Sequence, residues 1–498
     1  MDVIQTLEEQ VTELTSGNKI FTANYPQWIY LMQSYLGGED YRQAGLLTRY
    51  QLETNSEYQA RLQATPVENH CASVISVYNS FIFREEPDRE YGSLTGMPEL
   101  EDFLEDADMD GRSLNAFMKD VATWSNVFGH AWIIIAKPNL GLATRADEQD
   151  MGVRPYVNLL TPLTVLDWRW ERTPAGRYQL EYFKYVEDIN GDITVIKEWT
   201  NTEIRTSKVN TKEKIVHEQT IEINELGVIP AVCAYNRRSM VRGIGVSAIG
   251  DIADWQRFLY NCASEIDQSI RLDSHPSLVK TPETQAGVGA GAIIHMPDNL
   301  DPGLKPYVLD FAGASIGNIL DVIKHGVDSI DKMANTGAVR TVESRTMSGV
   351  AMETEFALLN ARLSESADNL ELAEESMWKL WAVYMGYVWD GEIDYPGSFN
   401  IRDTATEINQ LQTAKSAATD PRVLSAIDAK LLDWLDLDED ELVAVADSRI
   451  ISPDTVSEEY QEFEEHVMVD PVSGEERLVT SQEEHTVLAN QGWYHKEE

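Results

Sequence analysis

The sequence predicts an α+β protein in which a block of short strands lies between helical segments. Two observations lead to this fold class. Apolar residues recur at three- and four-residue spacing within residues 1–90 and again beyond residue 243, which is the period of amphipathic helices. Residues 131–236 instead contain short runs of Val, Ile, Tyr, Trp and Thr between turn residues, which favours a mostly antiparallel sheet. Separate groups of helices and strands are typical of α+β proteins.

Size and composition indicate a large globular chain. Its 498 residues, 43% hydrophobic and 25% charged, are enough for several domains. No apolar stretch approaches the roughly 20 residues that span a bilayer, so we expect no membrane contact. The first residues carry acids where a signal peptide has a basic start, so we expect no secretion by that route. Cys71, Cys233 and Cys262 form no motif, which indicates a reducing compartment without disulfides or a zinc site.

The formal net charge of −43 is the most unusual global property. A chain this acidic has no broad basic face, so we do not expect it to neutralise many phosphates of a nucleic acid. A surface that mostly repels phosphate still allows a strand to slide past it. Solubility alone explains the same acidity equally well.

The N-terminal part is predicted to be helical. Apolar positions favour helices over residues 25–36 and 67–83. After an acidic patch at residues 98–110, a further helix is predicted over residues 113–128, with Ser113 as its N-cap.

The strand block divides at its turn residues. Asn190 and Gly191 separate two of the runs and predict a tight hairpin, because a type I′ turn needs positive φ at both central residues. The predicted strands cover residues 131–136, 156–160, 164–168, 177–186, 192–199, 203–206 and 214–223.

Two long helices are predicted next, over residues 244–272 and 315–334, each with a narrow apolar stripe. They can lie antiparallel, because residues 275–313 between them are rich in Pro and Gly and break any helix. This segment is expected to form a compact knob on a two-helix stalk. Its short strands are expected at residues 278–279, 292–295 and 307–309.

The remaining chain is predicted to be helical and then acidic. A polar loop, residues 335–349, leads to a long helix over residues 350–388. Short helices follow at residues 406–418 and 420–432. Residues 433–498 are strongly acidic and their pattern weakens toward the end, so we expect partial disorder or folding on contact with another subunit.

One fragment imitates a calcium loop. Asp106, Asp108, Asp110 and Gly111 have the right spacing at its start, but Phe117 occupies the twelfth position, where a bidentate Glu is needed. An acidic turn before the next helix is the simpler interpretation.

Other fragments resemble catalytic motifs only superficially. Residues 287–291 are rich in glycine but lack the Lys and Ser or Thr of a P-loop. Residues 245–250 have one residue too many for a nucleophile elbow, so Ser247 is interpreted as the start of the stalk helix. The nine histidines form no pair with metal-ligand spacing. We therefore expect no catalytic residue, no metal and no cofactor.

Cations gather near the polar loop. Arg340 and Arg345 lie among Thr and Ser residues, and Lys324 and Lys332 share the preceding helix near one face. The plain interpretation is a solvated connection with two solubilising lysines. The alternative is that these side chains touch a phosphate backbone without base specificity.

The order of these parts resembles that of a portal protein of a tailed bacteriophage, the ring at one capsid vertex through which DNA enters and leaves. The resemblance covers most of the chain and depends on the combination of parts, because no single motif is diagnostic. The supporting local sequences are residues 111–117 leading to 128–135, residues 158–162 followed by Trp168, residues 243–247 and residues 348–351.

The resemblance implies a portal-like fold with an α+β wing, a two-helix stem, a small α/β clip, a long wing helix and a helical crown. The implied parts are the wing (1–243 and 350–403), the first stem helix (244–272), the clip (273–314), the second stem helix (315–334), the tunnel loop (335–349) and the crown with its acidic tail (404–498).

The resemblance also implies a function and partners. Such proteins are not enzymes. They form dodecameric rings in the virion, assembled in the host cytoplasm, that conduct double-stranded DNA during packaging and ejection. The implied partners are further copies of the chain, DNA, terminase, a neck or tail adaptor and the major capsid protein. The residues expected to face the DNA channel are Arg340, Arg345, Lys324 and Lys332, and those expected at the docking clip are Lys280, His295 and Lys305.

Two alternatives stay open. A neck adaptor or a scaffold would share the acidity and the helices, and imaging distinguishes them because only a portal forms a turbine-shaped ring with a continuous bore. A hydrolase with an unrecognised site would need a nucleophile and a base within hydrogen-bond reach.

Overall fold

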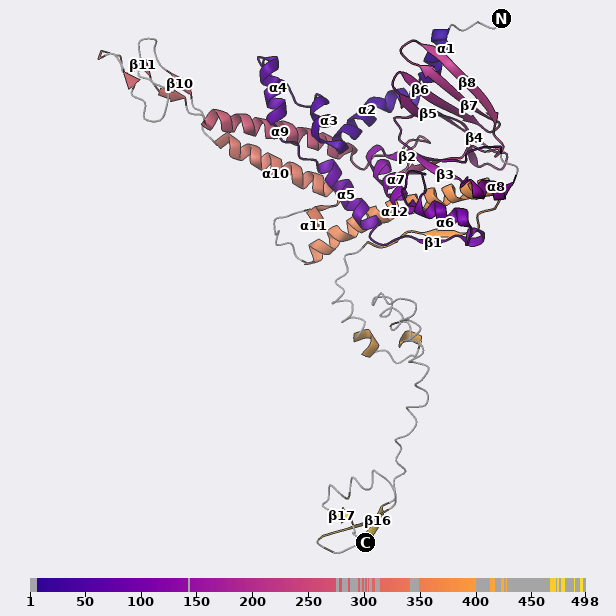
Figure 1. Ribbon diagram of the computed structural model, residues 1–498. Coiled ribbons are helices and arrows are strands. Elements are labelled where there is room, and N and C mark those ends of the chain that lie inside the picture. The colour runs from indigo at the N-terminus through magenta and orange to yellow at the C-terminus, as the bar shows by residue number, and fades with distance from the viewer. Residues whose placement is uncertain are drawn as a thin grey trace. The chain divides into compact units, whose positions relative to one another are not determined.

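The chain forms two compact units, Met1–Asn400 and Ile401–Glu498, in the computed structural model (Figure 1). The described residues are 7–141, 144–274, 277–279, 285–286, 294–295, 298–299, 301, 303, 307–309, 314–340, 349–399, 413–416, 422–424, 427, 466–471, 473, 476–479, 488 and 493–495.

The predicted mixture of helices and antiparallel strands is confirmed. Ser113 caps the helix that follows it, as predicted, because its side chain accepts a hydrogen bond from the backbone N–H of Ala116. The N-terminal helices are α1 (Leu7–Thr15), α2 (Lys19–Leu36), α3 (Gly38–Gln43), α4 (Asn55–Ala64), α5 (His70–Ile82), η1 (Gly92–Leu94), α6 (Pro98–Glu105), α7 (Leu114–Phe128) and α8 (Arg145–Asp150).

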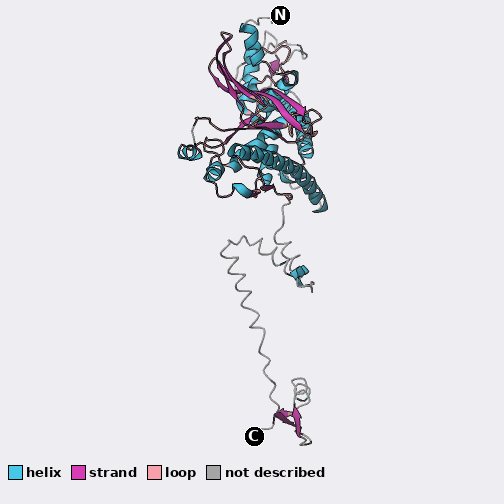
Figure 2. Ribbon diagram, turned by 90° about the vertical axis from the view of Figure 1, so that its right-hand side faces the viewer, coloured by secondary structure: helices cyan, strands magenta, loops and turns pink. Residues whose placement is uncertain are grey.

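The strand block forms two antiparallel sheets in the first unit (Figure 2). The five-stranded sheet is a meander of β4 (Val165–Arg172), β5 (Tyr178–Asn190), β6 (Ile193–Thr200), β7 (Glu203–Asn210) and β8 (Ile215–Ile223). The three-stranded sheet has the order β3 (Tyr156–Leu160), β2 (His130–Ala136) and β9 (Ala231–Tyr235). All seven predicted strands exist, and β9 is an addition.

The hairpin between β5 and β6 differs from its prediction. Asn190 is the last residue of β5 and pairs with Ile193, so Gly191 and Asp192 are the central turn residues. Only Gly191 has positive φ, at 62°. That pattern belongs to a type II′ turn and not to the predicted type I′ turn.

The core of the first unit is built around β2. Every residue of this strand except Ala136 is buried, as expected for a strand covered on both faces. Trp132 is fully buried and its ring lies 4.9 Å from that of Phe183, which belongs to the five-stranded sheet. Helix α7 packs on β2, and the long helix α12 (Gly349–Met385) packs on β9. One continuous apolar core therefore joins both sheets to these helices.

The long central helices are present with small changes in their bounds. They are α9 (Gly250–Ser274), α10 (Ala314–Ala334), the short α11 (Gly337–Arg340) and α12. Helix α9 begins later than the predicted residue 244, because Arg238 forms an isolated β-bridge with Gly245 and keeps the preceding residues in a loop. Helix α12 ends at Met385, where Tyr387 donates its backbone N–H to the carbonyl of Ala382.

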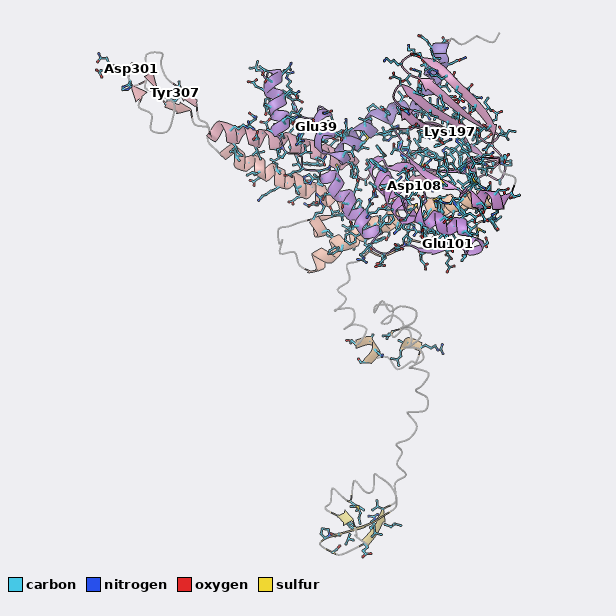
Figure 3. All side chains as sticks on the ribbon, viewed as in Figure 1. Glu39, Glu101, Asp108, Lys197, Asp301 and Tyr307 are labelled. Carbon is cyan, nitrogen blue, oxygen red and sulfur yellow. The ribbon has the colours of Figure 1, made fainter. Side chains whose placement is uncertain are left out.

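The segment between α9 and α10 contains short paired strands, and Figure 3 shows Asp301 and Tyr307 beyond the outer ends of both helices. The pairs are β10 (Ser277–Val279) with β13 (Tyr307–Leu309), and β11 (Gln285–Ala286) with β12 (Ile294–His295). The strands predicted at residues 278–279 and 307–309 are confirmed, and β11 is an addition. The strand predicted at residues 292–295 is confirmed at residues 294–295, and its first two residues lie outside the described residues.

The second unit contains a small antiparallel sheet. Its described strands are β15 (His466–Val469), β16 (Glu476–Val479) and β17 (Tyr494–His495). Met468, Val479 and Leu488 are buried together beneath it. The weak sequence pattern did not predict this sheet. The predicted helices over residues 406–418 and 420–432 lie mostly outside the described residues, with helix at 413–416, 422–424 and 427.

A buried ion pair fixes α12 to the ribbon formed by β1 (Asp88–Glu90) and β14 (Glu392–Asp394). Arg89 Nε lies 2.7 Å from Glu374 Oε1, and the Glu374 side chain is fully buried. Tyr395 donates its hydroxyl to Glu374 Oε2 at 2.6 Å, and burial raises the pKa of Tyr395. The carboxylate also accepts a hydrogen bond from the indole of Trp378. A buried charge is costly unless it is fully partnered, and this one is.

Among the helices that the structure describes, none combines the length and the apolar character that a bilayer span requires.

We expect Glu374→Ala to lower the free energy of unfolding by about 3–5 kcal/mol, because it leaves the Arg89 guanidinium buried without its partner. Urea denaturation followed by tryptophan fluorescence measures this. The double variant Arg89→Met with Glu374→Leu removes both charges and should regain most of the loss. A loss below about 1 kcal/mol in the single variant would contradict the assigned role.

Candidate functional site

Helices α9 and α10 lie side by side and antiparallel, and extend from the α+β body (Figure 1). They approach closely at Gly326, where an added Cβ would lie 2.6 Å from Leu259 Cδ2 and 3.4 Å from the Trp255 ring. Leu259 is buried, so it has little room to move. Glycine at residue 326 therefore sets the spacing of the two helices.

Helix α9 is fastened to the N-terminal helices by a buried arginine that the sequence analysis did not identify. Arg61 forms two hydrogen bonds with the Glu53 carboxylate, at 2.8 and 2.7 Å, and donates to Ser264 of α9 at 3.0 Å. Its guanidinium also lies 4.1 Å from the centre of the Tyr50 ring. These contacts hold α4 and the loop before it against α9.

The base of α9 is set by two glycines. An added Cβ at Gly245 would lie 1.8 Å from the carbonyl oxygen of Gly129, and Gly129 itself has a φ of 91°. Because the obstructing atom is backbone, it cannot move aside alone. Ser247 donates its hydroxyl to the carbonyl of Val127 at 2.7 Å and accepts from the backbone N–H of Ile249. Ser247 thus has a structural role just before α9.

His130 lies beneath this crossing. Its Nδ1 accepts a hydrogen bond from the backbone N–H of Gly245 at 3.3 Å, and its ring is fully buried. Burial lowers the pKa of His130 to about 3, so the ring is neutral at neutral pH.

Arg340 is held within the chain. Its Nη1 lies 2.7 Å from Asp331 Oδ1, and its Nη2 lies 2.9 Å from His70 Nδ1. The side chains of Arg340 and Asp331 are only 11% and 8% exposed. Burial and the nearby guanidinium lower the pKa of His70. Arg340 thus clamps α11 against α10 and α5. That it faces a DNA channel was implied by the resemblance alone and stays a prediction.

The two candidate lysines have different surroundings from Arg340. Lys324 and Lys332 are exposed, and neither forms an ion pair or a hydrogen bond with any described residue. With Asp321 and Asp328 they follow the spacing i, i+3, i+7 and i+11, which places all four on one face of α10. We name this set the alternating stripe, because its charges change sign from one residue to the next.

Of the three residues predicted at the docking clip, the structure describes one. His295 is exposed on β12, where it pairs with Gln285. Lys280, Lys305 and the channel candidate Arg345 lie outside the described residues.

The fragment that imitates a calcium loop is an acidic turn. Asp106 accepts from the backbone N–H of Gly111 at 2.8 Å, and Asp108 accepts from that of Asp110 at 2.9 Å. Asp108 also pairs with Arg112. Among the residues that the structure describes, no group of three His, Cys, Asp or Glu side chains is placed to hold a metal ion.

The cysteines are unpaired, and burial raises the pKa of both Cys71 and Cys233 to about 12. A thiol with such a pKa is not an activated nucleophile at neutral pH.

No protein-family model and no curated protein sequence matches this chain. Chains in solved structures of gene transfer agent (GTA) particles are similar over most of its length. One, in the virion of the native particle, has 10% identity and a TM-score of 0.38, and the match covers 80% of this chain and 99% of that one.

Two further matches come from necks of GTA particles. A chain in the neck of the empty particle, with C6 symmetry, has 9% identity and a TM-score of 0.40, covering 79% of this chain and 99% of that one. A chain in the neck of the native particle, with C12 symmetry, has 12% identity and a TM-score of 0.38, covering 79% and 98%. Because all three TM-scores are 0.40 or lower, these matches assign no role to any residue.

The free energy of unfolding should depend on pH through His130. The folded chain keeps this ring neutral down to about pH 3, whereas an unfolded histidine takes up a proton below about pH 6.5. Stability is therefore lost as the pH falls below about 6.5, by about 2 kcal/mol at pH 5. Urea denaturation at pH 7 and pH 5 should show that His130→Asn loses less on acidification than the parent. His217→Asn, at an exposed site, serves as the control.

Arg340→Ala should lower the free energy of unfolding by about 2–4 kcal/mol, because it leaves Asp331 buried without its partner. Lys332→Ala, on the exposed face of the neighbouring helix, should change it by less than about 0.5 kcal/mol. Thermal and urea denaturation check both values. If Arg340→Ala proves as stable as the parent, the clamp is wrong and the guanidinium is available for a channel.

Proposed function

We propose that this chain is the subunit of a portal ring that conducts double-stranded DNA into and out of a capsid. The observation that carries the proposal is the antiparallel α9–α10 pair. It leaves the α+β body, bears short strands beyond its outer end, and returns through α11 into α12. In this assignment the body is the wing, the helix pair is the stem, and the strands between them belong to the clip.

The alternating stripe supports a channel wall that binds DNA only weakly. Lys324 and Lys332 offer two exposed cations, while Asp321 and Asp328 bring the formal charge of the stripe to zero. Lysines on such a face attract the phosphates of a passing DNA strand and aspartates repel them, so the contacts do not add up to tight binding. The net charge of −43 opposes tight binding elsewhere. The proposed consequence is sequence-independent sliding of DNA past α10.

The structural role of Arg340 narrows the proposed channel contacts. Of the four predicted cations, Lys324 and Lys332 are exposed and unpaired with described residues, and Arg340 is clamped. We therefore propose the two lysines as the phosphate contacts, with Arg345 as a third.

The remaining partners follow from the same proposal. The clip would dock the terminase during packaging and a neck or tail adaptor afterwards. The C-terminal unit would form the crown inside the capsid, and the body would face the major capsid protein. The ring would assemble in the host cytoplasm, contain twelve copies and catalyse no reaction.

Imaging of the purified chain tests the architecture. Electron microscopy should show closed rings with a continuous bore and a turbine-shaped side view. Filled discs, or a monomer at every concentration, would contradict the portal assignment and favour a neck adaptor or a scaffold.

The double variant Lys324→Glu with Lys332→Glu should reduce the amount of DNA retained per particle at least severalfold, because it makes the stripe uniformly acidic. Particles assembled with each variant and assayed for nuclease-protected DNA provide the measurement. Lys212→Glu with Lys214→Glu makes the same charge change at exposed positions of the β7–β8 turn and should leave retention unchanged. Equal retention in all three would rule out the α10 contact.

A further inference from the structure

A groove with a volume of about 740 Å³ lies between four elements: the five-stranded sheet, β9, α12 and the loop that precedes α9. Its described lining includes Arg177, Arg238, Arg242 and Lys379, and no Asp or Glu. We name this surface the arginine groove. The chain as a whole has 83 acidic and 40 basic residues, so a lining with cations alone runs against its composition.

Aromatic rings support two of these arginines, Arg238 and Arg242, and leave their charge uncompensated. The Arg242 guanidinium lies 3.9 Å from the centre of the Tyr178 ring, and that of Arg238 lies 5.4 Å from the Tyr235 ring. Neither arginine, nor Arg177, forms an ion pair with a described residue. Lys379 pairs with Glu375 at 2.7 Å. Cation–π contacts orient a guanidinium and leave its N–H groups available to a carboxylate.

An apolar tip completes the surface. Met240, between Arg238 and Arg242 on the loop, is fully exposed, and Val241 beside it is 46% exposed. Arg, Tyr, Trp and Met are the residues enriched in protein–protein interfaces. An exposed methionine side chain forms neither a hydrogen bond nor an ion pair with a phosphate backbone, so this composition favours a protein partner over a nucleic acid.

The partner that fits is a second copy of this chain, an inference that rests on the proposed ring. A ring uses heterologous contacts, in which one patch of each subunit meets a different, complementary patch of the next. Copies with a net charge of −43 repel each other, and a groove lined by cations alone is a place where that repulsion is reversed. We propose that the arginine groove is the basic half of the contact between neighbouring copies. It binds exposed carboxylates of the adjacent subunit, with Met240 packed against that subunit.

The double variant Arg238→Glu with Arg242→Glu tests this. We expect ring assembly, measured by mass photometry across a concentration series, to weaken at least about thirtyfold, as for the loss of a hot spot. Met240→Ser, which changes no charge, should weaken it by a smaller factor. Lys212→Glu with Lys214→Glu carries the same charge change away from the groove and should assemble normally. Circular dichroism and a thermal melt confirm that each variant is folded.

The outcomes separate the inference from the proposed function. Normal rings from the folded groove variant would overturn the inference while the portal proposal stands. Normal rings that lose binding of labelled duplex DNA would also overturn it, in favour of a nucleic-acid surface. If the parent chain forms only dimers, and the groove variant dissociates them, the ring proposal fails and the contact between copies holds.

Discussion

The meeting of two backbones at Gly129 and Gly245 determines how the rest of the first unit is arranged. The end of α7 and the loop before α9 approach so closely that neither position has room for a side chain. This contact fixes where α9 starts relative to β2, whose first residue, His130, lies directly beneath it. Steric constraints of this kind cannot be relieved by rotamer changes, because the atoms in contact belong to the backbone. This contact therefore positions the base of the helix pair relative to β2.

Most elements could be predicted because their periodicity is strong and local. The predicted helix over residues 315–334 corresponds to α10 (Ala314–Ala334), and the seven strands were found in their predicted places. Errors arose where tertiary contacts decide the outcome. The predicted start of α9 at residue 244 ignored the bridge between Arg238 and Gly245, and a bridge of this kind leaves no periodic signal.

The site was less predictable than the fold, because charge alone does not show where a side chain points. Arg340 and Lys332 looked equivalent in the sequence, yet one is clamped by Asp331 and His70 and the other is exposed. His70 lies 270 positions away, so only the folded chain shows this contact. Glu374 did leave a signal. It falls on the mostly apolar buried face of α12, where a charged residue indicates a buried partner.

The absence of a side chain at Gly326 has a mechanical consequence. This residue lies about 18 Å along α10 from Ala314, and the clip strands lie further out. If the two helices separated slightly at residue 326, their outer ends would move by a larger distance, because these ends lie further from the base of the pair. The position of the clip then depends on the spacing between α9 and α10 at Gly326.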